Sequence, residues 1–478
     1  MILKRFYDEK LAQASYLIGC AATGDALVVD PNRDTEQYVR AAEAEKLRVT
    51  AVTETHIHAD YLSGSRELAQ VTGATLYLSG EGGDEWSYAF AATDGATLVH
   101  DGDRFSVGNI RIEVRHTPGH TPEHLTFLVT DTAGADRPIA AVTGDFIFVG
   151  DVGRPDLLER AAGLHGTMEE GARTLFASLR RFAAEQPDWL QIWPGHGAGS
   201  ACGKGMSAIP HSTLGYEKLF NWALATEDEG EFVAAVLAGQ PEPPRYFAEM
   251  KRLNREGPPA LGGFRIPPRL PGAQLADALE GGATVVDLRP ADAFAAGHVP
   301  GTVSIPLNKS FPTWAGSLVP FGRAFYLLGG DEAAAAQAAR DLAMIGLDDA
   351  AGWWGADVLD AWPGELERVP QINAAELRAR MEAGEVAVVD VRGRSEWDAG
   401  HLPDVPNLPL AFLAGRIGEI PAGRTVVLQC QGGARSMIAA SVLQAHGIKD
   451  VVNLTGGYQA WAAAGLPTEK PEPALAPA

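Results

Sequence analysis

The sequence predicts a multidomain α/β protein, and three observations support this class. Over residues 1–250, short runs of aliphatic and β-branched residues alternate with amphipathic helical stretches, as in layered α/β domains. A stretch rich in glycine and proline, 254–271, then interrupts the pattern and predicts a linker. Beyond it the sequence repeats itself at an offset of about a hundred residues, the length of one small α/β domain.

Composition limits the classes of partner. The chain has 478 residues, 46% of them hydrophobic, and a formal net charge of −22. Such an acidic surface disfavours nucleic acids and anionic membranes, because their phosphates repel it. No apolar run reaches the roughly 18 residues that a membrane span needs, and no leader-like segment follows the first residues. Three widely spaced cysteines predict no disulfide framework, so we expect a soluble cytoplasmic protein in a reducing compartment.

The first region contains four clear strand candidates. Residues 26–30 and 49–52 are short apolar runs typical of buried strands. Residues 110–114 alternate apolar and charged side chains, which indicates a strand with one exposed face. Residues 139–143 follow a proline and again predict a buried strand.

Polar motifs follow several of these strands. The run T-H-I-H-A-D-Y occupies 55–61, P-G-H occupies 118–120, and T-G-D occupies 143–145. A later P-G-H at 194–196 adds one more histidine. Residues that leave strand ends lie at the rim of a sheet, where α/β proteins place their ligands. Histidines and carboxylates gathered at such a rim predict a metal centre.

These motifs resemble those of the metallo-β-lactamase superfamily over roughly residues 1–240, and the resemblance implies an αββα sandwich. The superfamily pattern H-x-H-x-D-H supports two metals, but Tyr61 stands here at its last position. The tyrosine removes an imidazole that the second metal would need, and His196 alone makes a poor second site. We therefore expect a mononuclear centre.

A mononuclear centre of two histidines and one carboxylate resembles the site of non-haem Fe(II) oxygenases. The chain is similar to the persulfide dioxygenase branch of the superfamily. That similarity implies one Fe(II) per chain, held by His56, His120 and Asp145. Neighbouring side chains would orient these ligands or hold water. These neighbours are His58, Asp60, Tyr61 and His196.

Two further features near the motifs are candidates for substrate chemistry. The loop G-R-P-D at 153–156 resembles a family motif near the substrate entrance, which implies that Arg154 binds a carboxylate of a glutathione-like carrier. The alternative is a structural pair between Arg154 and Asp156. Cys202, in a glycine-rich run, is a candidate redox thiol whose pKa Lys204 would lower, or else a passive thiol. Cys20 lies in an apolar strand and is expected in the core.

The second copy of the repeat, 368–467, contains a reactive-cysteine loop. A buried strand at 425–429 leads to Cys430, then Q-G-G-A and Arg435 at the start of a helix. Backbone N–H groups and the helix dipole favour a thiolate there. The loop resembles that of rhodanese sulfurtransferases, which implies a persulfide on Cys430. Tyrosine phosphatases use a similar loop, but Arg435 comes one residue too early for theirs.

The first copy, 272–367, has Gly329 opposite Cys430 and Ala334 opposite Arg435. Since both the nucleophile and its cationic partner are missing, we expect this rhodanese-like domain to be inactive and to serve as scaffold or oligomer contact. The tail 468–478 is rich in proline and alanine and predicts disorder.

Together the resemblances imply an enzyme that oxidises low-molecular-weight persulfides with O₂ to sulfite in a domain at 1–253. Sulfane sulfur transferred through Cys430 would then give thiosulfate. One alternative is a zinc thioester hydrolase of the glyoxalase II type with passive rhodanese-like domains. Another is a non-enzymatic persulfide sensor or sulfur carrier. The carrier thiol stays open between glutathione, coenzyme A and others, and we expect a homo-oligomer, either a dimer or a tetramer.

Overall fold

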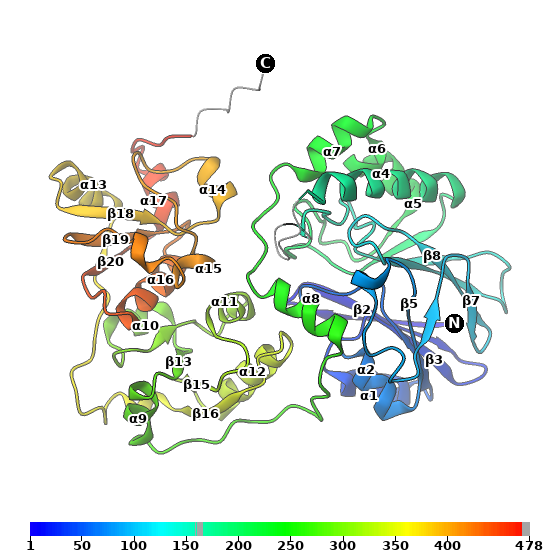
Figure 1. Cartoon of the computed structure of the whole chain (residues 1–478), viewed down its shortest axis with the longest axis horizontal. Helices are drawn as coiled ribbons and strands as arrows, with labels where there is room; N and C mark the ends of the chain where they lie inside the picture. The colour runs from blue at the N-terminus through cyan, green and yellow to red at the C-terminus, as the bar shows by residue number, and fades with distance from the viewer. Residues whose placement is uncertain (158, 160–165, 471–478) are drawn as a thin grey trace. The chain divides into compact units, whose positions relative to one another are not determined.

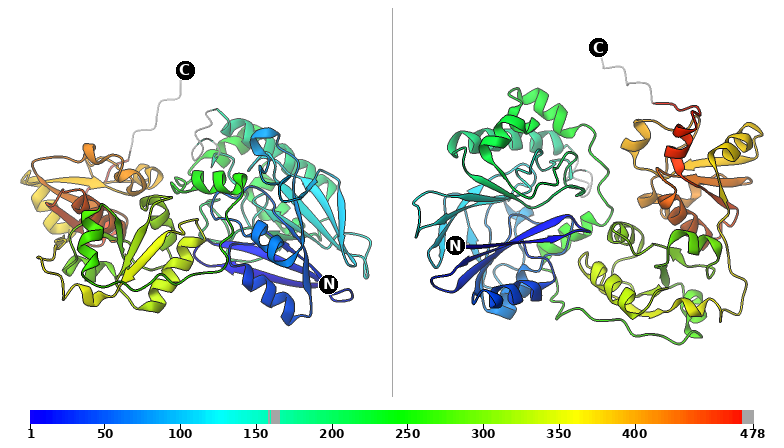
Figure 2. Two further views of the ribbon diagram at one scale, coloured as in Figure 1. Left: turned by 60° about the horizontal axis from the view of Figure 1, so that its bottom comes forward. Right: turned by 180° about the vertical axis from the view of Figure 1, so that it is seen from behind.

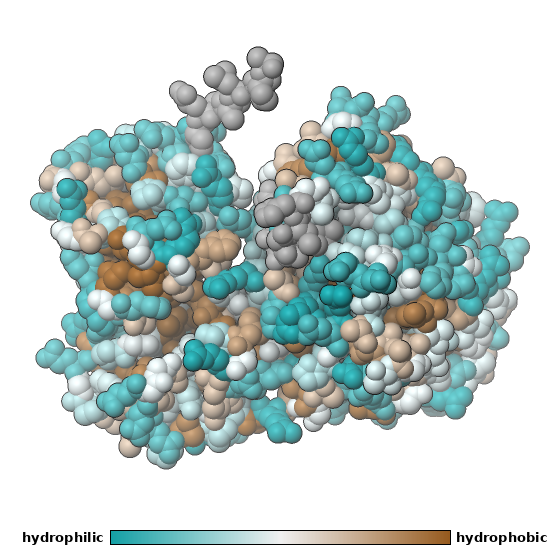
Figure 3. Space-filling model, viewed as in Figure 1, coloured by the Kyte–Doolittle hydropathy of each residue, from teal (hydrophilic) through white to brown (hydrophobic). Residues whose placement is uncertain are grey.

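The computed structural model describes residues 1–157, 159 and 166–470. Most of the tail predicted at 468–478 lies outside the described residues. Among the described helices, none is both long and apolar enough to cross a membrane. The face drawn in Figure 3 is mostly hydrophilic, in keeping with the net charge of −22.

The chain folds into two compact units. Unit 1 comprises Met1–Phe264 together with Ala343–Gly346. Unit 2 comprises Arg265–Leu342 and the chain from Leu347 onward. The glycine- and proline-rich stretch predicted as a linker therefore contains the boundary between the units.

Unit 1 contains two six-stranded sheets whose strands follow one another in chain order. The first sheet is antiparallel across its first three strands and parallel across the rest. Its strands are β1 (Ile2–Asp8), β2 (Gln13–Cys20), β3 (Asp25–Val29), β4 (Arg48–Thr53), β5 (Thr75–Ser79) and β6 (Thr97–Val99). Those of the second sheet are β7 (Arg104–Val107), β8 (Ile110–His116), β9 (Leu125–Asp131), β10 (Ala140–Gly144), β11 (Gln191–Pro194) and β12 (Ser212–Thr213). The four predicted strands correspond to β3, β4, β8 and β10.

Helices cover the outer face of each sheet, which completes the predicted αββα sandwich (Figures 1 and 2). The first sheet packs against α1 (Thr35–Ala44), α2 (Ser65–Thr72) and the short η1 (Asp84–Trp86). The second packs against α4 (Met168–Glu185), α5 (Leu214–Phe220), α6 (Trp222–Ala225) and α7 (Glu229–Leu237). A further helix of unit 1, α8 (Phe247–Glu256), follows α7 along the chain.

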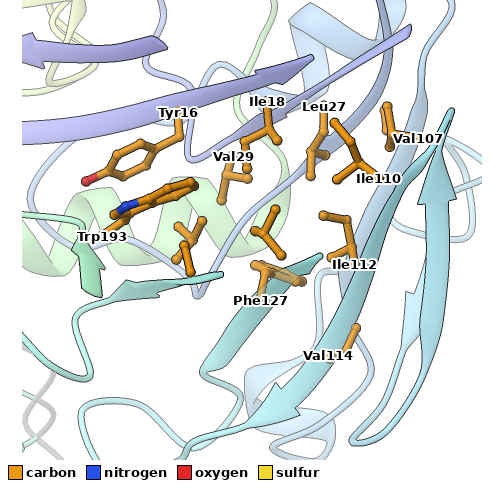
Figure 4. Packing of buried hydrophobic residues seen from close by; sticks show 14 of the residues in the cluster. Tyr16, Ile18, Leu27, Val29, Val107, Ile110, Ile112, Val114, Phe127 and Trp193 are labelled. Carbon is orange, nitrogen blue, oxygen red and sulfur yellow. The ribbon is translucent and has the colours of Figure 1, made fainter. Parts of the chain in front are cut away.

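The core of unit 1 lies between the two sheets (Figure 4). Tyr16 from β2 stacks on Trp193 from β11 with ring centroids 5.9 Å apart, and Phe127 packs beside the aliphatic residues of β3 and β8. Each fully buried aromatic or aliphatic side chain contributes about 1.5–3 kcal/mol by leaving water. This packing holds the ends of β4, β8, β10 and β11 at fixed positions, and each of the predicted polar motifs lies at the end of one of these strands.

Unit 2 contains two four-stranded parallel sheets, one for each copy of the repeat. The strand orders are β14-β13-β15-β16 and β17-β20-β19-β18. The first copy comprises α9 (Gln274–Glu280), β13 (Thr284–Asp287), α10 (Ala291–Ala296), β14 (Val303–Ser304), α11 (Phe311–Leu318), β15 (Phe325–Leu328), α12 (Glu332–Ala343), β16 (Ala350–Trp354) and η2 (Ala356–Val358). The second comprises β17 (Gln371–Ile372), α13 (Ala374–Glu382), β18 (Val386–Asp390), α14 (Arg394–Asp398), α15 (Leu410–Leu413), η3 (Ile417–Glu419), β19 (Thr425–Gln429), α16 (Ala434–Ala445), β20 (Val451–Leu454) and α17 (Gly457–Ala463).

The repeat seen in the sequence reflects repeated interactions in the structure. Arg289 forms a two-pronged ion pair with Asp287 after β13, and Arg392 does the same with Asp390 after β18. The helix α16 is buried along most of its length, because it contacts β14 of the first copy as well as its own sheet. Its sequence separates no polar face from an apolar one, which is typical of a helix covered on several sides.

Candidate functional site

Three of the predicted metal ligands converge at one edge of the unit 1 sandwich. His56 follows β4, Asp145 follows β10, and His120 lies on the loop between β8 and β9. All three are buried, and one ligand atom from each lies within 4.8 Å of the others. Nε2 of His120 is 3.4 Å from Oδ2 of Asp145. The sequence motifs therefore meet in space as a compact donor set.

Hydrogen bonds leave one nitrogen of each histidine free for a metal. Nδ1 of His120 is 2.9 Å from the carbonyl oxygen of Arg154, and Nδ1 of His56 is 3.0 Å from Oγ1 of Thr55. Such partners fix the protonated nitrogen and orient the other toward the ion. Burial lowers the pKa of His56 well below its ordinary value and lowers the pKa of His120, so both rings are neutral and able to bind metal.

Asp145 has the chemistry of a metal ligand. Both of its carboxylate oxygens are buried and have no hydrogen-bond partner among the described residues. A buried carboxylate without partners is costly, and a divalent cation satisfies it. Two open imidazole nitrogens and this carboxylate therefore fit a metal ion.

Asp30 is a site residue that the sequence analysis missed. It directly follows β3 with φ +53° and accepts hydrogen bonds from the Thr55 amide at 2.6 Å and the Thr55 hydroxyl at 3.0 Å. Its Oδ1 is also 3.1 Å from Nε2 of His58. Burial opposes the charge on His58, but Asp30 together with Glu54 and Asp60 outweighs burial, and the pKa of His58 is raised to about 9. The available signal was a carboxylate at the end of a buried strand beside β4.

Tyr61 takes no part in the donor set. Its hydroxyl donates to the backbone carbonyl of Asp30 at 3.2 Å, and its ring lies beside His58 with centroids 4.5 Å apart. The hydroxyl is thus directed to a backbone carbonyl and the ring packs on His58, so a role for Tyr61 beside the metal ligands stays a prediction.

Glu123 and His124 also belong to the site and were not singled out from the sequence. The ring of His124 lies 5.1 Å from that of His56, and its Nε2 accepts from the Asp145 amide at 3.1 Å. Glu123 accepts from the Ile57 amide at 2.8 Å. Burial raises the pKa of Glu123 to about 7. Both follow the predicted His120 motif within four residues, so the extended run P-G-H-T-P-E-H was the signal.

A second set of ligand-type side chains lies next to the first. Asp60, His196 and Cys202 are all buried, and one ligand atom from each lies within 4.8 Å of the others. Nε2 of His196 is 3.3 Å from Oδ2 of Asp60 and 3.4 Å from Oδ1 of Asp145. The predicted neighbours Asp60 and His196 are therefore grouped with the thiol expected near the metal rim.

The expected influence of Lys204 on Cys202 is wrong. Burial, followed by the charges of Asp60 and Asp145, raises the pKa of the Cys202 thiol well above its ordinary value. The Lys204 ammonium donates instead to the carbonyl oxygens of Ala235 and Ala238. The lysine is oriented by these carbonyls and does not activate the thiol.

Arg154 is completely buried and braces the loop that follows Asp145. Its Nε and Nη2 each donate to Asp156 at 2.7 Å, and its Nη1 donates to the carbonyl of Ala201 at 3.1 Å. These bonds connect the 153–156 loop to the chain just before Cys202. The guanidinium of Arg154 is thus already paired with groups of the protein itself. Binding of a substrate carboxylate by Arg154 stays a prediction.

A narrow cavity leads to His120. It is lined by Ile57, Ala59, Trp86, His120, Thr121, Leu157, Phe247 and Lys251. The Lys251 ammonium lies 3.7 Å from the centre of the Trp86 ring. The cavity is small and largely apolar, with one cation on its wall, and it lies beside the predicted ligand His120.

The second predicted site is the loop after β19. Sγ of Cys430 accepts from the Gly433 amide at 3.1 Å and from the Ser436 hydroxyl at 3.4 Å. Gly433, with φ +98°, caps the N-terminus of α16, so the helix dipole points at the sulfur. Arg435 forms a two-pronged ion pair with Glu396 at 2.5 and 2.6 Å, a partner that the sequence analysis did not name.

The equivalent loop of the first copy has no nucleophile. Gly329 directly follows β15, as Cys430 directly follows β19. A Cβ atom at Gly329 would lie 2.5 Å from Cγ of Arg289. The arginine side chain therefore occupies the space that a side chain at Gly329 would need.

The fold and both sites define a metallo-beta-lactamase-type sandwich joined to two rhodanese-like domains, and the family models match both parts. The model of the metallo-beta-lactamase superfamily matches residues 9–196, and the model of the rhodanese-like domain matches residues 272–354 and 373–464. The chain belongs to the metallo-beta-lactamase superfamily and carries a tandem pair of rhodanese-like domains.

Known proteins resemble each part. A metallo-beta-lactamase from Staphylococcus aureus subsp. aureus COL, solved as a crystal structure, is 42% identical with a TM-score of 0.67 over 74% of this chain and 99% of that one. A sulfurtransferase from Allochromatium vinosum is 40% identical over 105 residues, 22% of this chain and 98% of the relative. The mitochondrial persulfide dioxygenase ETHE1 from Bos taurus is 28% identical over 200 residues, 41% of this chain and 68% of the relative. The chain covers between 46% and 98% of the length of the first curated relatives that it matches.

Proposed function

We propose that the chain is a persulfide dioxygenase combined with a rhodanese sulfurtransferase. The observation that carries the proposal is the donor set of His56, His120 and Asp145, two neutral imidazoles and an unpartnered carboxylate at one edge of the sandwich. This set suits Fe(II), one per chain, with positions left open. Bound Fe(II) would supply the redox chemistry that zinc lacks, by passing electrons to O₂. The similarity to a persulfide dioxygenase supports the same activity.

The reaction at this site converts a persulfide RSSH, O₂ and water into the thiol RSH and sulfurous acid. The terminal sulfur is oxidised, O₂ is reduced, and the carrier leaves as a thiol. The small cavity beside His120 would mark the side from which the persulfide approaches, and Lys251 on its wall would attract an anionic carrier such as glutathione or coenzyme A. The buried walls exclude bulk water from the sulfur.

The loop of Cys430 performs the second reaction. Sulfite attacks the outer sulfur of a persulfide on Cys430, the S–S bond breaks, and thiosulfate leaves. The electron pair of that bond stays on the Cys430 thiolate. The Gly433 amide and the Ser436 hydroxyl stabilise this thiolate, together with the N-terminus of α16. Sulfite from the first reaction is the natural acceptor for the second.

Metal analysis combined with O₂ uptake tests the proposal. The chain, purified anaerobically and loaded with Fe(II), should consume O₂ with persulfides of glutathione, coenzyme A or cysteine, and one of these should be preferred. Zinc-loaded protein should consume none. Absence of O₂ uptake by the Fe(II)-loaded protein, together with hydrolysis of thioesters by the zinc-loaded protein, would favour the hydrolase alternative and contradict the proposal.

A further inference from the structure

A pocket of about 410 Å³ opens on the outer face of the second sheet of unit 1. Ile110 and Ile112 of β8 point into the core between the sheets, so the alternate residues Arg111 and Glu113 point to the outer face. The pocket is bounded there by β8 and β9, by the chain before β10 and by the end of α4. Its volume falls in the range of pockets that hold small organic ligands.

This pocket is distant from the proposed metal centre. It lies at the C-terminal end of α4, where Ala184 and Glu185 line it. The loop of His120 packs instead near the start of this helix, since a Cβ atom at Gly171 would lie 3.4 Å from the carbonyl oxygen of Gly119. The helix between Gly171 and Ala184 spans about 20 Å, at roughly 1.5 Å per residue. The pocket also shares no lining residue with the cavity beside His120, so the two are separate.

Positive charge is concentrated at this pocket. The charged residues that line it are Arg111, Glu113, Arg115, Arg137 and Glu185. Glu113 is already neutralised, because Nη2 of Arg115 lies 2.9 Å and Nη2 of Arg104 lies 2.7 Å from its carboxylate oxygens. The guanidinium groups therefore outweigh the carboxylates here, although the whole chain has a net charge of −22. An anion repelled by the rest of the surface is attracted to this pocket.

Several donors of these arginines lack an acceptor. Nε of Arg111 and Nε of Arg115 are buried without a hydrogen-bond partner among the described residues. Nη2 of Arg180 is in the same condition, and Arg180 precedes the pocket residue Ala184 by one turn on the same face of α4. Arg137 is exposed and forms no ion pair within the described part of the chain. Unpaired buried N–H groups are costly, and an anion with several oxygens would satisfy them.

We propose that Arg111, Arg115 and Arg137 form a binding site for a tetrahedral oxyanion of the phosphate type, either free or carried by a small organic molecule. Guanidinium groups bind such oxygens through paired, charge-assisted hydrogen bonds. Nη2 of Arg111 donates to the carbonyl of Asp136 at 2.7 Å, so this guanidinium is held in place before a ligand arrives. Inorganic phosphate, a phosphate ester and thiosulfate all offer this chemistry. The site goes beyond the proposed function and does not depend on it.

Calorimetric titration of the full chain tests the site and distinguishes these sources. Inorganic phosphate, adenosine 5′-monophosphate and thiosulfate are titrated separately at low ionic strength, in a chain that carries Cys430→Ser so that thiosulfate cannot transfer sulfur. We expect one equivalent to bind per chain, and added NaCl to weaken the binding because salt screens these partly exposed charges. Equal binding of all three anions assigns a free oxyanion. Preference for the nucleotide assigns a phosphorylated organic molecule, and preference for thiosulfate assigns a sulfur oxyanion.

Variants in the same background locate the bound anion. Arg111→Gln and Arg137→Gln should each weaken binding by about tenfold or more, because each removes charged hydrogen-bond donors. Arg137 is exposed, so its replacement leaves the fold intact, and circular dichroism checks both variants. Glu185→Gln should strengthen binding about two- to fivefold, because it removes a repelling charge from the pocket. Arg40→Gln, an equal charge change at an exposed residue of α1, should bind as the parent chain does.

Two results would overturn the proposal. One is the absence of binding of all three anions to the parent chain. The other is an unchanged affinity in both Arg111→Gln and Arg137→Gln, which would place the bound anion elsewhere on the molecule.

Discussion

At the proposed metal centre, the candidate ligands are oriented by hydrogen bonds to residues behind them. Thr55 and the Arg154 carbonyl hold Nδ1 of His56 and His120, while Asp30 anchors Thr55 in turn. Such supporting contacts commonly change metal affinity by about 10–100-fold when removed. The centre therefore depends on residues that are not ligands.

Replacement of His120 by alanine should abolish iron binding and O₂ uptake together. Two remaining protein ligands hold Fe(II) poorly, so the iron content should fall from one per chain toward zero and the rate by more than about 100-fold. Metal analysis and an oxygen electrode measure both effects. His100→Ala is a matched control, because His100 is exposed and lies outside both donor sets. Normal iron content in His120→Ala would contradict the assignment of this ligand.

Among the elements, the loops after β15 and β19 show how two similar folds differ in chemistry. Both loops leave the middle of a parallel sheet and lead to a helix. The second presents Cys430 to the N-terminus of α16, whereas the first presents Gly329 and is filled by Arg289. The shared backbone fold is therefore not sufficient for sulfur transfer, which also needs a nucleophile in the loop.

The first rhodanese-like domain should contribute no sulfur transfer. Cys430→Ser in the full chain should abolish thiosulfate:cyanide sulfurtransferase activity, because Gly329 supplies no nucleophile to replace the lost thiol. Thiocyanate formation measures this activity. The buried Cys20 provides the control, since Cys20→Ser should keep the full rate. Residual turnover in Cys430→Ser would show that the first copy is active after all.

The start of α17 should control the shape of the Cys430 loop. A Cβ atom at Gly457 would lie 2.0 Å from the Cys430 carbonyl oxygen, and the residue has φ +53°. Gly457→Ala should therefore push the loop away from the N-terminus of α16 and lower sulfurtransferase activity by about tenfold or more, at a cost of about 1–3 kcal/mol in stability. O₂ uptake should be unchanged. Gly418→Ala, where a Cβ meets nothing within 4 Å, is the control for both assays.

For the molecule as a whole, the important feature is that the sites of the two proposed reactions, sulfite formation and sulfane-sulfur transfer, belong to one chain. The donor set belongs to unit 1 and the Cys430 loop to unit 2. Each site is complete within its own unit, so a substitution at one should leave the ligands of the other intact. The products of the two reactions are then a direct measure of coupling.

Cys430→Ser should change the product and not the O₂ consumption. With a low-molecular-weight persulfide, the wild type should release thiosulfate, whereas the variant should release sulfite at equal O₂ consumed. Chromatography after thiol labelling separates the two products. Identical product mixtures would mean that the two domains are only tethered. Loss of O₂ uptake would mean that Cys430 delivers the substrate to the metal centre.

Much of the fold and of the first donor set could be predicted from the sequence by itself. Buried strands have a short apolar signature, and the histidines and the aspartate stand directly beside strand ends. The cysteine loop is likewise local, since strand, nucleophile, glycines and helix follow one another along the chain. Features of this kind need no knowledge of distant residues.

Only the tertiary structure brought together what is distant along the chain. Asp60 was predicted as a neighbour of the iron ligands and Cys202 as a redox thiol, but nothing local indicated that they meet at His196. The same is true of Asp30 behind Thr55 and of Glu396 on Arg435. Such sets form where strand ends from separate parts of the chain are packed at one edge, and the packing of the whole core decides which side chains meet there.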